Sequence, residues 1–416
     1  MVLHRGLCAT WSHRAWLKRV RSSGQDASCG MANSQNVPPR RPSATGPAAV
    51  DRFQPSVHPF VPVADVVALR FGGLLPTFAL REVGVTSDTL RGLCRSGVLH
   101  GIRRGVYVTA ERWRAAGVDE RYRLLVRATV LAAGRIPVLS HQSAAVLHGL
   151  PIIGGWPATV HTSTPDASGG NTARSTTGHR GPVPGKVQTI DGCQVTSLAR
   201  TLVDVAASSS FLVGVTMMDH ALRVAQPWAG RARSEHGIDA GQHSDGRGRP
   251  TGAASREVDP TRAVPTMLSG VTKEDLYREL DAVNPRTGRR RAEQAIAFAS
   301  PLAANPGETL SRVRIFELGF EVPELQVRFP DILGGDVWVD FFWRRVRKIG
   351  EFDGFLKYGS GPVLGDRDPS AVVWAEKQRE DALRARVNSF DRWGWELAFS
   401  PPRFFAFLTE RGVPRA

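Results

Sequence analysis

The sequence has few cysteines and no long run of apolar residues. Its 416 residues include only 4 cysteines, which lie far apart without a Cys-x-x-Cys pair or a histidine at zinc-finger spacing. This spacing does not indicate a disulfide framework or a structural zinc site and is typical of a reducing cytoplasm. No stretch approaches the roughly 18 consecutive apolar residues that a membrane-spanning helix needs, and the opening residues lack the apolar segment of a secretory signal. We therefore expect a cytoplasmic protein with no membrane partner.

Acidic residues are also scarce relative to basic ones. The chain has 54 Lys and Arg against 39 Asp and Glu, a net charge of +15, and such an excess favours a polyanionic partner, nucleic acid above all. The excess is uneven, since residues 1–50 carry seven basic side chains and one acidic one. That segment has two interpretations, a transit-peptide-like leader or an extension ahead of Met31, so the start is either Met1 or Met31.

Two stretches lack apolar periodicity and separate the chain into blocks. Residues 1–59 and 227–265 are rich in Arg, Gly, Ser and Pro, and segments of this composition cannot bury enough apolar surface to offset the entropy lost on ordering. We predict that the first is a disordered basic segment and the second a disordered insertion. The ordered blocks are 60–116, 117–226, a helical connector at 266–299 and a last block at 300–416.

Residues 60–116 have the pattern of three short helices followed by a hairpin. The third helix begins at Thr86 or Ser87 and ends at Gly97. The run VLHGIRRGVYVT then alternates apolar and polar residues around a tight turn at Arg103, Arg104 and Gly105, which presents both arginines. This order predicts a winged helix-turn-helix whose third helix enters a DNA major groove. The residues expected to contact DNA are Arg91, Arg95, Arg103 and Arg104. The alternative is a protein-docking module in which these arginines form a solvated face.

A family resemblance supports the DNA-binding interpretation. LLPTFALREVGVTSDTLRGLCRSGVLHGIRRGVYV, VLSHQSAAVLHGLP and VTSLARTLVDVA, between about residues 65 and 223, resemble the AbiEi-type antitoxins of type IV toxin-antitoxin systems. The resemblance implies a winged helix that binds its own promoter and a second domain that opposes a nucleotidyltransferase toxin. A cognate toxin is then a candidate partner beside DNA, and a homodimer is left open.

The block at 117–226 is predicted to be a small α/β domain. Ser140 is placed to cap a helix over 141–147, and Thr196 or Ser197 one over 198–206, while 159–163 and 187–195 are predicted strands. Two i, i+4 residues, Arg200 and Asp204, are expected to form an ordinary ion pair. Three histidines could be metal ligands or partly buried structural side chains, and we favour the second interpretation: His141, His148 and His161.

The last block contains three carboxylates in otherwise apolar strands. DVWVDFFW and KIGEFDG predict a hairpin in which Asp340 lies on one strand and Glu351 and Asp353 share a face of the other. Buried unpaired carboxylates destabilise a fold, and a divalent cation removes that cost. We therefore predict a Mg²⁺ (or Mn²⁺) site with Asp340, Glu351 and Asp353 as ligands. Lys357 is the first candidate for a catalytic lysine and Lys377 the second.

Residues 300–400 resemble the PD-(D/E)XK nuclease superfamily, and more closely the relatives of very-short-patch-repair endonucleases. The resemblance rests on ETLSRVRIFELGF, VDFFW, IGEFDGFLKYG and EKQRE. It implies a restriction-endonuclease-like α/β domain with Asp340 and Glu351 as the acidic pair and Glu308 as the first-helix glutamate of the catalytic set. The pattern departs at Asp353, where that superfamily has lysine.

The predicted architecture is multidomain α/β: an N-terminal winged helix-turn-helix, a small middle domain and a restriction-endonuclease-like C-terminal domain. Two hypotheses for its function stay open. In the first, the protein is a Mg²⁺-dependent DNA endonuclease of phage defence or DNA repair. In the second, it is an AbiEi-type antitoxin and transcriptional autorepressor with a catalytically inert nuclease-like domain.

Overall fold

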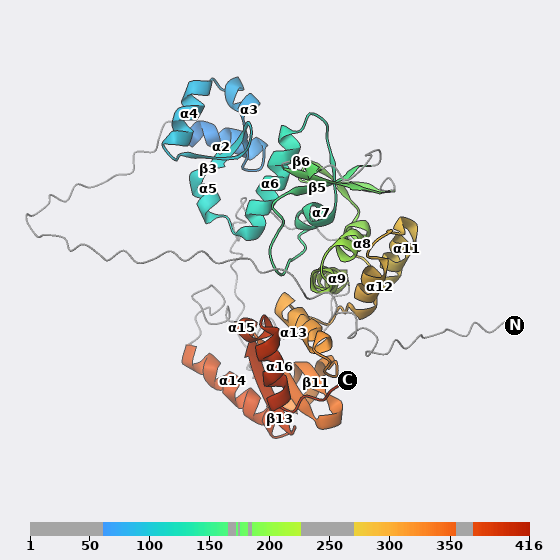
Figure 1. Ribbon diagram of the computed structural model, residues 1–416. Coiled ribbons are helices and arrows are strands. Elements are labelled where there is room, and N and C mark those ends of the chain that lie inside the picture. Colours follow the sequence, from blue (N-terminus) through green and yellow to red (C-terminus); the bar gives the residue numbers. More distant parts are fainter. Residues whose placement is uncertain (1–60, 165–171, 174, 182–184, 226–269, 355–368) are drawn as a thin grey trace, which may run out of the picture. The chain divides into compact units, whose positions relative to one another are not determined.

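The computed structural model describes residues 61–164, 172–173, 175–181, 185–225, 270–354 and 369–416. Over these residues the protein is mixed α/β, with 14 α-helices and three sheets, as the coarse prediction of fold class requires (Figure 1). No helix in this part of the chain is both long enough and apolar enough to cross a membrane. The predicted disordered segments 1–59 and 227–265, and Lys357, lie outside the described residues.

The three helices and the hairpin predicted near the start of the chain are present. The elements are α2 (Val61–Arg70), β1 (Leu75–Pro76), α3 (Thr77–Glu82), α4 (Ser87–Arg95), β2 (Leu99–Arg103), β3 (Val106–Thr109) and α5 (Ala110–Ala115). Thr86 caps α4 by accepting a hydrogen bond from the Thr89 amide at 3.2 Å, and Leu90 and Leu93 are the buried residues of that helix. The hairpin turns at Arg104 and Gly105, where glycine takes a φ of +77° without strain. Strand β1 pairs with β3 and completes a sheet of order β1-β3-β2.

A six-stranded sheet of order β6-β7-β5-β4-β9-β8 organises the middle of the chain. Its elements are α6 (Val118–Ala132), β4 (Val138–Leu139), α7 (His141–Leu147), β5 (Val160–Thr164), β6 (Thr172–Ala173), β7 (Thr176–Arg180), β8 (Val187–Ile190), β9 (Cys193–Thr196), α8 (Leu198–Ser208) and α9 (Phe211–Ala225). The predicted strand at 187–195 is a hairpin instead. Asp191 and Gly192 both have positive φ, the conformation of a tight two-residue turn between antiparallel strands.

The two predicted caps behave differently. The Ser197 hydroxyl accepts a hydrogen bond from the Arg200 amide and caps α8. Ser140 occupies the cap position of α7, but no helix amide donates to its side chain; its hydroxyl contacts Nδ1 of His141 at 3.0 Å instead. His141 has a φ of +52°, which is unusual for a residue other than glycine.

The predicted connector contains two helices that pack closely on α8 and α9. They are α11 (Lys273–Val283) and α12 (Arg289–Phe298). Thr272 and Asp275 form a reciprocal capping box at the start of α11. Before α12, Gly288 lies so close to α8 that a Cβ atom there would be 1.9 Å from the Ala207 carbonyl oxygen. Only glycine permits this close approach, which places the start of α12 directly against α8.

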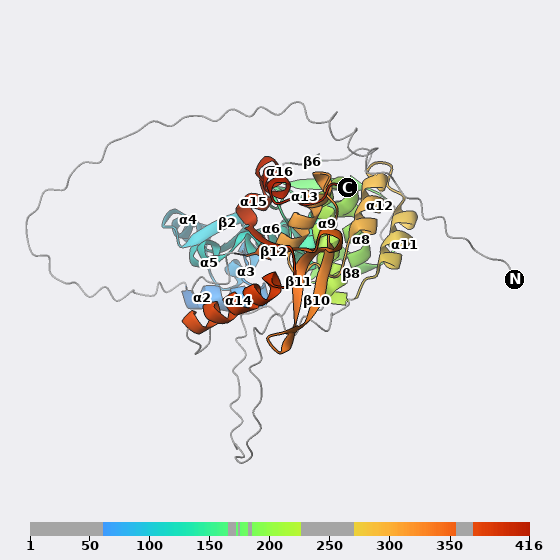
Figure 2. The ribbon, with the colours of Figure 1, turned by 90° about the horizontal axis from the view of Figure 1, so that it is seen from below.

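A four-stranded sheet with helices on both faces forms the C-terminal part. Its elements are α13 (Pro306–Glu317), β10 (Glu324–Ile332), β11 (Gly335–Trp343), the 3-10 turn η1 (Arg344–Val346), β12 (Lys348–Asp353), α14 (Pro369–Arg384), β13 (Ser389–Gly394), α15 (Trp395–Ala398) and α16 (Pro401–Glu410). The order is β10-β11-β12-β13, antiparallel except for the parallel β12–β13 pair. Phe341 and Trp343 pack in one apolar cluster with α13, α15 and α16, whereas Phe342 and Ile349 pack with Leu383 of α14. Figure 2 shows the ribbons of α13, α15 and α16 grouped together and that of α14 apart from them.

Candidate functional site

Glu308 is buried at the start of α13. Asn305 caps this helix by accepting hydrogen bonds from the Gly307 and Glu308 amides at 2.9 and 3.0 Å. Gly307 lets α13 approach β12, because a Cβ there would be 2.0 Å from the ring of Phe352. Glu308 is therefore only 3% exposed, and its carboxylate accepts hydrogen bonds from the Ala304 amide at 2.8 Å and the Asn305 side chain at 2.6 Å.

Asp340 of β11 is joined to Glu308 through Gln326 of β10. The Gln326 side-chain amide donates to Glu308 Oε2 at 3.2 Å and to Asp340 Oδ1 at 3.3 Å. The backbone amide of Phe352 in β12 donates to the second Asp340 oxygen at 2.9 Å. We call Glu308 and Asp340 the acid pair. Three consecutive elements, α13, β10 and β11, thus place two carboxylates around one amide group.

The two carboxylates of the acid pair carry like charges, and Glu308 is buried. Burial, and after it the charge of Asp340, raise the pKa of Glu308 well above its usual range. The hydrogen bonds from the Ala304 amide and from Gln326 act in the opposite direction. Glu308 therefore holds its proton more tightly than an exposed glutamate, and a cation bound beside it would displace that proton.

Glu351 has a different environment on β12. Its two oxygens accept hydrogen bonds from Arg379 of α14 at 3.2 and 3.0 Å, and Arg392 of β13 lies 3.1 Å from one of them. Both arginines also bond Glu376. Glu351 and Glu376 on one side and Arg379 and Arg392 on the other form a network in which each carboxylate faces two guanidinium groups.

The predicted ligand set is thus distributed over separate environments. Asp340 neighbours Glu308, Glu351 is bound by arginines, and Asp353 is half-buried at the end of β12. Among the described residues, no group of three or more His, Cys, Asp and Glu side chains is arranged to hold a metal ion. For the Mg²⁺ that the nuclease resemblance implies, the acid pair fits, because a cation would relieve its repulsion. Glu351 does not fit in this arrangement, because guanidinium groups contact its oxygens.

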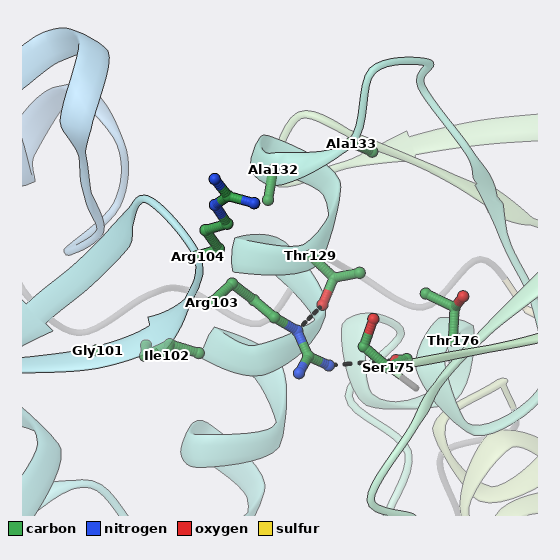
Figure 3. A pocket seen from close by; sticks show the side chains of 9 residues that line it. All are labelled: Gly101, Ile102, Arg103, Arg104, Thr129, Ala132, Ala133, Ser175 and Thr176. Carbon is green, nitrogen blue, oxygen red and sulfur yellow. Dashed lines mark hydrogen bonds between the residues drawn. The ribbon is translucent and has the colours of Figure 1, made fainter. Parts of the chain in front are cut away.

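Three of the four arginines predicted to contact DNA are exposed. Arg91 and Arg95 lie on the outer face of α4, where Arg91 pairs with Asp88, and Arg104 is exposed in the hairpin turn. Arg103 is different. It lies within β2, is half-buried, and donates to the Thr129 hydroxyl of α6 at 2.8 Å and to the Ser175 carbonyl at 3.2 Å (Figure 3).

Arg103 therefore attaches the hairpin to the middle of the chain. Burial lowers the pKa of its guanidinium, and the side chain forms part of the wall of a hollow of about 570 Å³ between the hairpin, α6 and β7. The prediction that Arg103 projects from the turn beside Arg104 does not hold in this structure, because the turn is one residue shorter and the Arg103 donors are used internally.

Three histidines form a cluster, but they are not the three that the sequence suggested. The rings of His141 and His179 stack with centroids 3.5 Å apart, and His161 Nδ1 lies 2.7 Å from His179 Nε2. His148 lies outside this contact and bonds the Thr196 carbonyl at 2.9 Å. We call His141, His161 and His179 the histidine cluster.

The predicted Arg200–Asp204 ion pair is present, with both Asp204 oxygens 2.9 Å from Arg200 Nε.

Sequence reasoning missed His179, Gln326, Arg379 and Arg392. His179 falls in TTGHR, a strand without apolar alternation, and the register between β5 and β7 brings it beside His161. Gln326 has a φ of +50° inside a strand, which no local pattern predicts. For Arg379 and Arg392, the one signal in the sequence was that several arginines lie near the acidic residues of this block.

Comparison with protein-family models and with curated proteins gives no match for this chain. The arguments below therefore rest on the geometry of its own residues.

Proposed function

We propose that the protein binds DNA through its N-terminal helices and hairpin and that its C-terminal part is a Mg²⁺-dependent DNA endonuclease of phage defence or repair. The observation that carries this proposal is the acid pair joined through Gln326. Glu308 is buried beside the half-buried Asp340, and acids whose pKa is perturbed by burial and by a neighbouring charge are frequent at functional sites. The proposal also rests on the resemblance of residues 300–400 to PD-(D/E)XK nucleases.

The residues of the pair have distinct tasks in this proposal. Glu308 and Asp340 would hold the cation, which when bound would polarise a scissile phosphate and lower the pKa of a water. Gln326 orients both carboxylates through its amide. The Phe352 amide holds the remaining Asp340 oxygen in place, so that the pair keeps its geometry before a cation binds. The role of Lys357 as the catalytic lysine stays a prediction.

DNA recognition is assigned to a winged helix formed by α2, α3, α4 and the β2–β3 hairpin. The exposed Arg91 and Arg95 on α4 would contact phosphates or base edges in a major groove. Arg104 in the turn would contact the backbone beside it. This part of the proposal is shared by both hypotheses for the C-terminal part.

The test is a cleavage assay on mixed DNA substrates with Mg²⁺ or Mn²⁺. We expect nicking or cutting by the parent protein and a loss of at least about 100-fold in Asp340→Asn, because the cation loses a charged ligand. The matched control is Asp336→Asn, in the same strand as Asp340. This change removes a carboxylate whose ion-pair partner is Arg328, and the variant should keep activity. A parent protein that cuts no substrate with either cation would exclude the endonuclease.

One observation favours a second candidate, an AbiEi-type antitoxin and autorepressor with an inert nuclease-like domain. Glu351 is bound by Arg379 and Arg392, and Asp353 stands where the superfamily has lysine. The first feature removes a ligand from a cation site, and the second removes the lysine that catalysis in that superfamily uses. This candidate predicts metal-independent binding to the protein's own promoter and an adjacent toxin gene. Promoter binding in the presence of a chelator, together with absence of cleavage, would identify it.

A further inference from the structure

A polar hollow of about 410 Å³ lies at the edge of the C-terminal sheet. It is formed by the end of α14, by β13 and by the end of α16. Three arginines line it, Arg384, Arg392 and Arg411, together with the side chains of Asn388 and Ser389. We call it the arginine hollow. The acid pair is not among the residues that line it.

Two aromatic rings support the three guanidinium groups. The Cζ atoms of Arg384 and Arg392 lie 4.9 and 5.4 Å from the centroid of Phe390, and that of Arg411 lies 5.6 Å from Phe407. These contacts orient the arginines by cation–π attraction. They also bring three like charges to one hollow, which costs electrostatic free energy unless an anion is present.

The carboxylate in the wall does not remove this excess. Asp391 lines the hollow, but it forms an ion pair with Lys348, whose side chain is 3% exposed. It also accepts a hydrogen bond from Ser389 at 3.1 Å. Because Lys348 already balances Asp391, this carboxylate does not neutralise the arginines of the hollow.

Carboxylates on α14 balance two of the arginines in part. Glu380 accepts a hydrogen bond from Arg384 at 2.8 Å and lies 3.4 Å from Nε of Arg392. Arg392 also bonds Glu376 and lies 3.1 Å from Glu351 of β12, so it is the most fully balanced of the three. An arginine has five N–H donors, so each side chain keeps donors beyond those that these glutamates use.

Arg411 is the least balanced of the three. Within the described residues, its ion-pair contacts are with Asp391 at 3.7 Å and Glu410 at 4.0 Å, both longer than a hydrogen bond. Its side chain is 49% exposed. This guanidinium can therefore turn its donors toward a ligand without breaking a strong internal contact.

We propose that the arginine hollow binds a phosphate group, with Arg411 as the principal donor and Arg384 and Arg392 as supporting charges. Phosphate oxygens accept paired hydrogen bonds from guanidinium groups. The phosphate can be carried by a nucleic-acid strand or be free in solution. The site acts independently of whether the acid pair cleaves DNA.

Calorimetric titration of the full-length protein tests this site with three probes. They are inorganic phosphate and a single-stranded oligonucleotide with and without a 5′-phosphate. Arg411→Ala should weaken binding of the probe that the parent protein binds by about tenfold, the loss of one charge-assisted contact. The matched control is Arg403→Ala on the same helix, which removes an arginine paired with Glu396 at 2.8 Å and should leave affinity within about twofold.

The three probes distinguish the sources of phosphate. Preference for the 5′-phosphorylated strand assigns a terminal phosphate, equal binding of both strands assigns a backbone diester, and binding of inorganic phosphate alone assigns the free ion. Arg384→Gln should cause a similar loss and keeps the test valid if Arg411→Ala melts early. The proposal is overturned if the parent protein binds none of the probes saturably, or if Arg403→Ala weakens binding as much as Arg411→Ala.

Discussion

Gln326 shows how a single residue controls the acid pair. Its amide nitrogen donates to both carboxylates, and it does so from a strand position with φ +50°, a conformation in which non-glycine residues carry strain. The strained backbone thus places one donor between two acceptors. A bound cation would offset the charge of Asp340, which is one cause of the raised pKa of Glu308.

Replacement of Asp340 by Asn should stabilise the metal-free protein. The change removes one of two neighbouring negative charges at nearly constant volume, and we expect a gain of about 1 kcal/mol in the free energy of unfolding. The added stability that Mg²⁺ gives to the parent by mass action should be absent in the variant. Differential scanning calorimetry with and without Mg²⁺ measures both effects. A lower melting temperature for metal-free Asp340→Asn would contradict this account.

The histidine cluster should make stability depend on pH. Burial, and then the charge of His179, lower the pKa of His161 to about 4, against about 6.5 in an unfolded chain. Between these values the unfolded state binds a proton that the folded state does not, so the free energy of unfolding falls as the pH falls from about 6.5 toward 4. Burial first, and then His179, His161 and Arg200, lower the pKa of His141 well below its usual range, so His141 contributes to the pH dependence in the same direction.

His161→Gln should flatten this dependence by an amount on the order of 1 kcal/mol between pH 7 and pH 5, a figure reduced for the solvent that reaches the ring. Urea unfolding at a series of pH values measures the slope. His100→Gln, which removes a histidine stacked on Trp113 outside the cluster, should retain the pH dependence of the cluster. Equal slopes for parent and His161→Gln would show that the cluster titrates as it does in the unfolded chain.

At the scale of elements, the β2–β3 hairpin separates two arginines that are adjacent in sequence. Arg103 points toward α6 and donates to Thr129, while Arg104 extends elsewhere, beside Ala132 (Figure 3). The alternation of side chains along a strand, and the turn at Arg104 and Gly105, account for the difference. One arginine therefore serves the packing of the hairpin and the other is exposed for a ligand.

Salt titrations of DNA binding should distinguish these two roles. Arg104→Ala should weaken binding and reduce the slope of log affinity against log salt by about 0.9, as expected for one lost phosphate contact. Arg103→Ala should lower the melting temperature with little change in that slope. The assignment of the wing would fail if Arg104→Ala left both affinity and slope unchanged.

On the scale of the whole molecule, the core crosses the predicted boundary at residue 300. One apolar cluster contains residues of α8, α9 and α12 together with residues of α13, β11 and α16. A buried ion pair lies in the same region: Arg312 of α13 donates to both oxygens of Asp219 of α9 at 3.0 and 2.8 Å. Thr309 also donates to Asp219, at 2.9 Å, so α9 and α13 share a polar contact inside an apolar core.

Breaking this ion pair should be costly, and removing it whole should cost less. Arg312→Met leaves the Asp219 carboxylate buried beside Thr309 without its guanidinium, and we expect a loss of about 3–5 kcal/mol in the free energy of unfolding. The double variant Arg312→Met with Asp219→Leu should recover a large part of that loss. Urea unfolding of the parent, both single variants and the double variant completes the cycle. Additive losses would indicate that the two residues do not interact.

The sequence by itself determined the local features of this protein. Thr86 with the apolar residues of α4 specified that helix, Gly105 specified a tight turn, and the alternation in DVWVDFFW specified a strand containing Asp340. These features depend on backbone conformations and on side chains a few residues apart, so composition and periodicity contain them. The excess of arginine and the unusual acids in apolar strands likewise indicated where to look for function.

Only the tertiary structure decided which of these side chains act together. The pairing of Glu308 with Asp340 depends on the close approach of α13 to the sheet and on Gln326, and the binding of Glu351 by Arg379 and Arg392 depends on α14 and β13. Such partners are set by the register of strands and by the packing of helices far apart in the chain. No local pattern encodes them, because many arrangements bury the same apolar residues equally well while each brings different polar groups into contact.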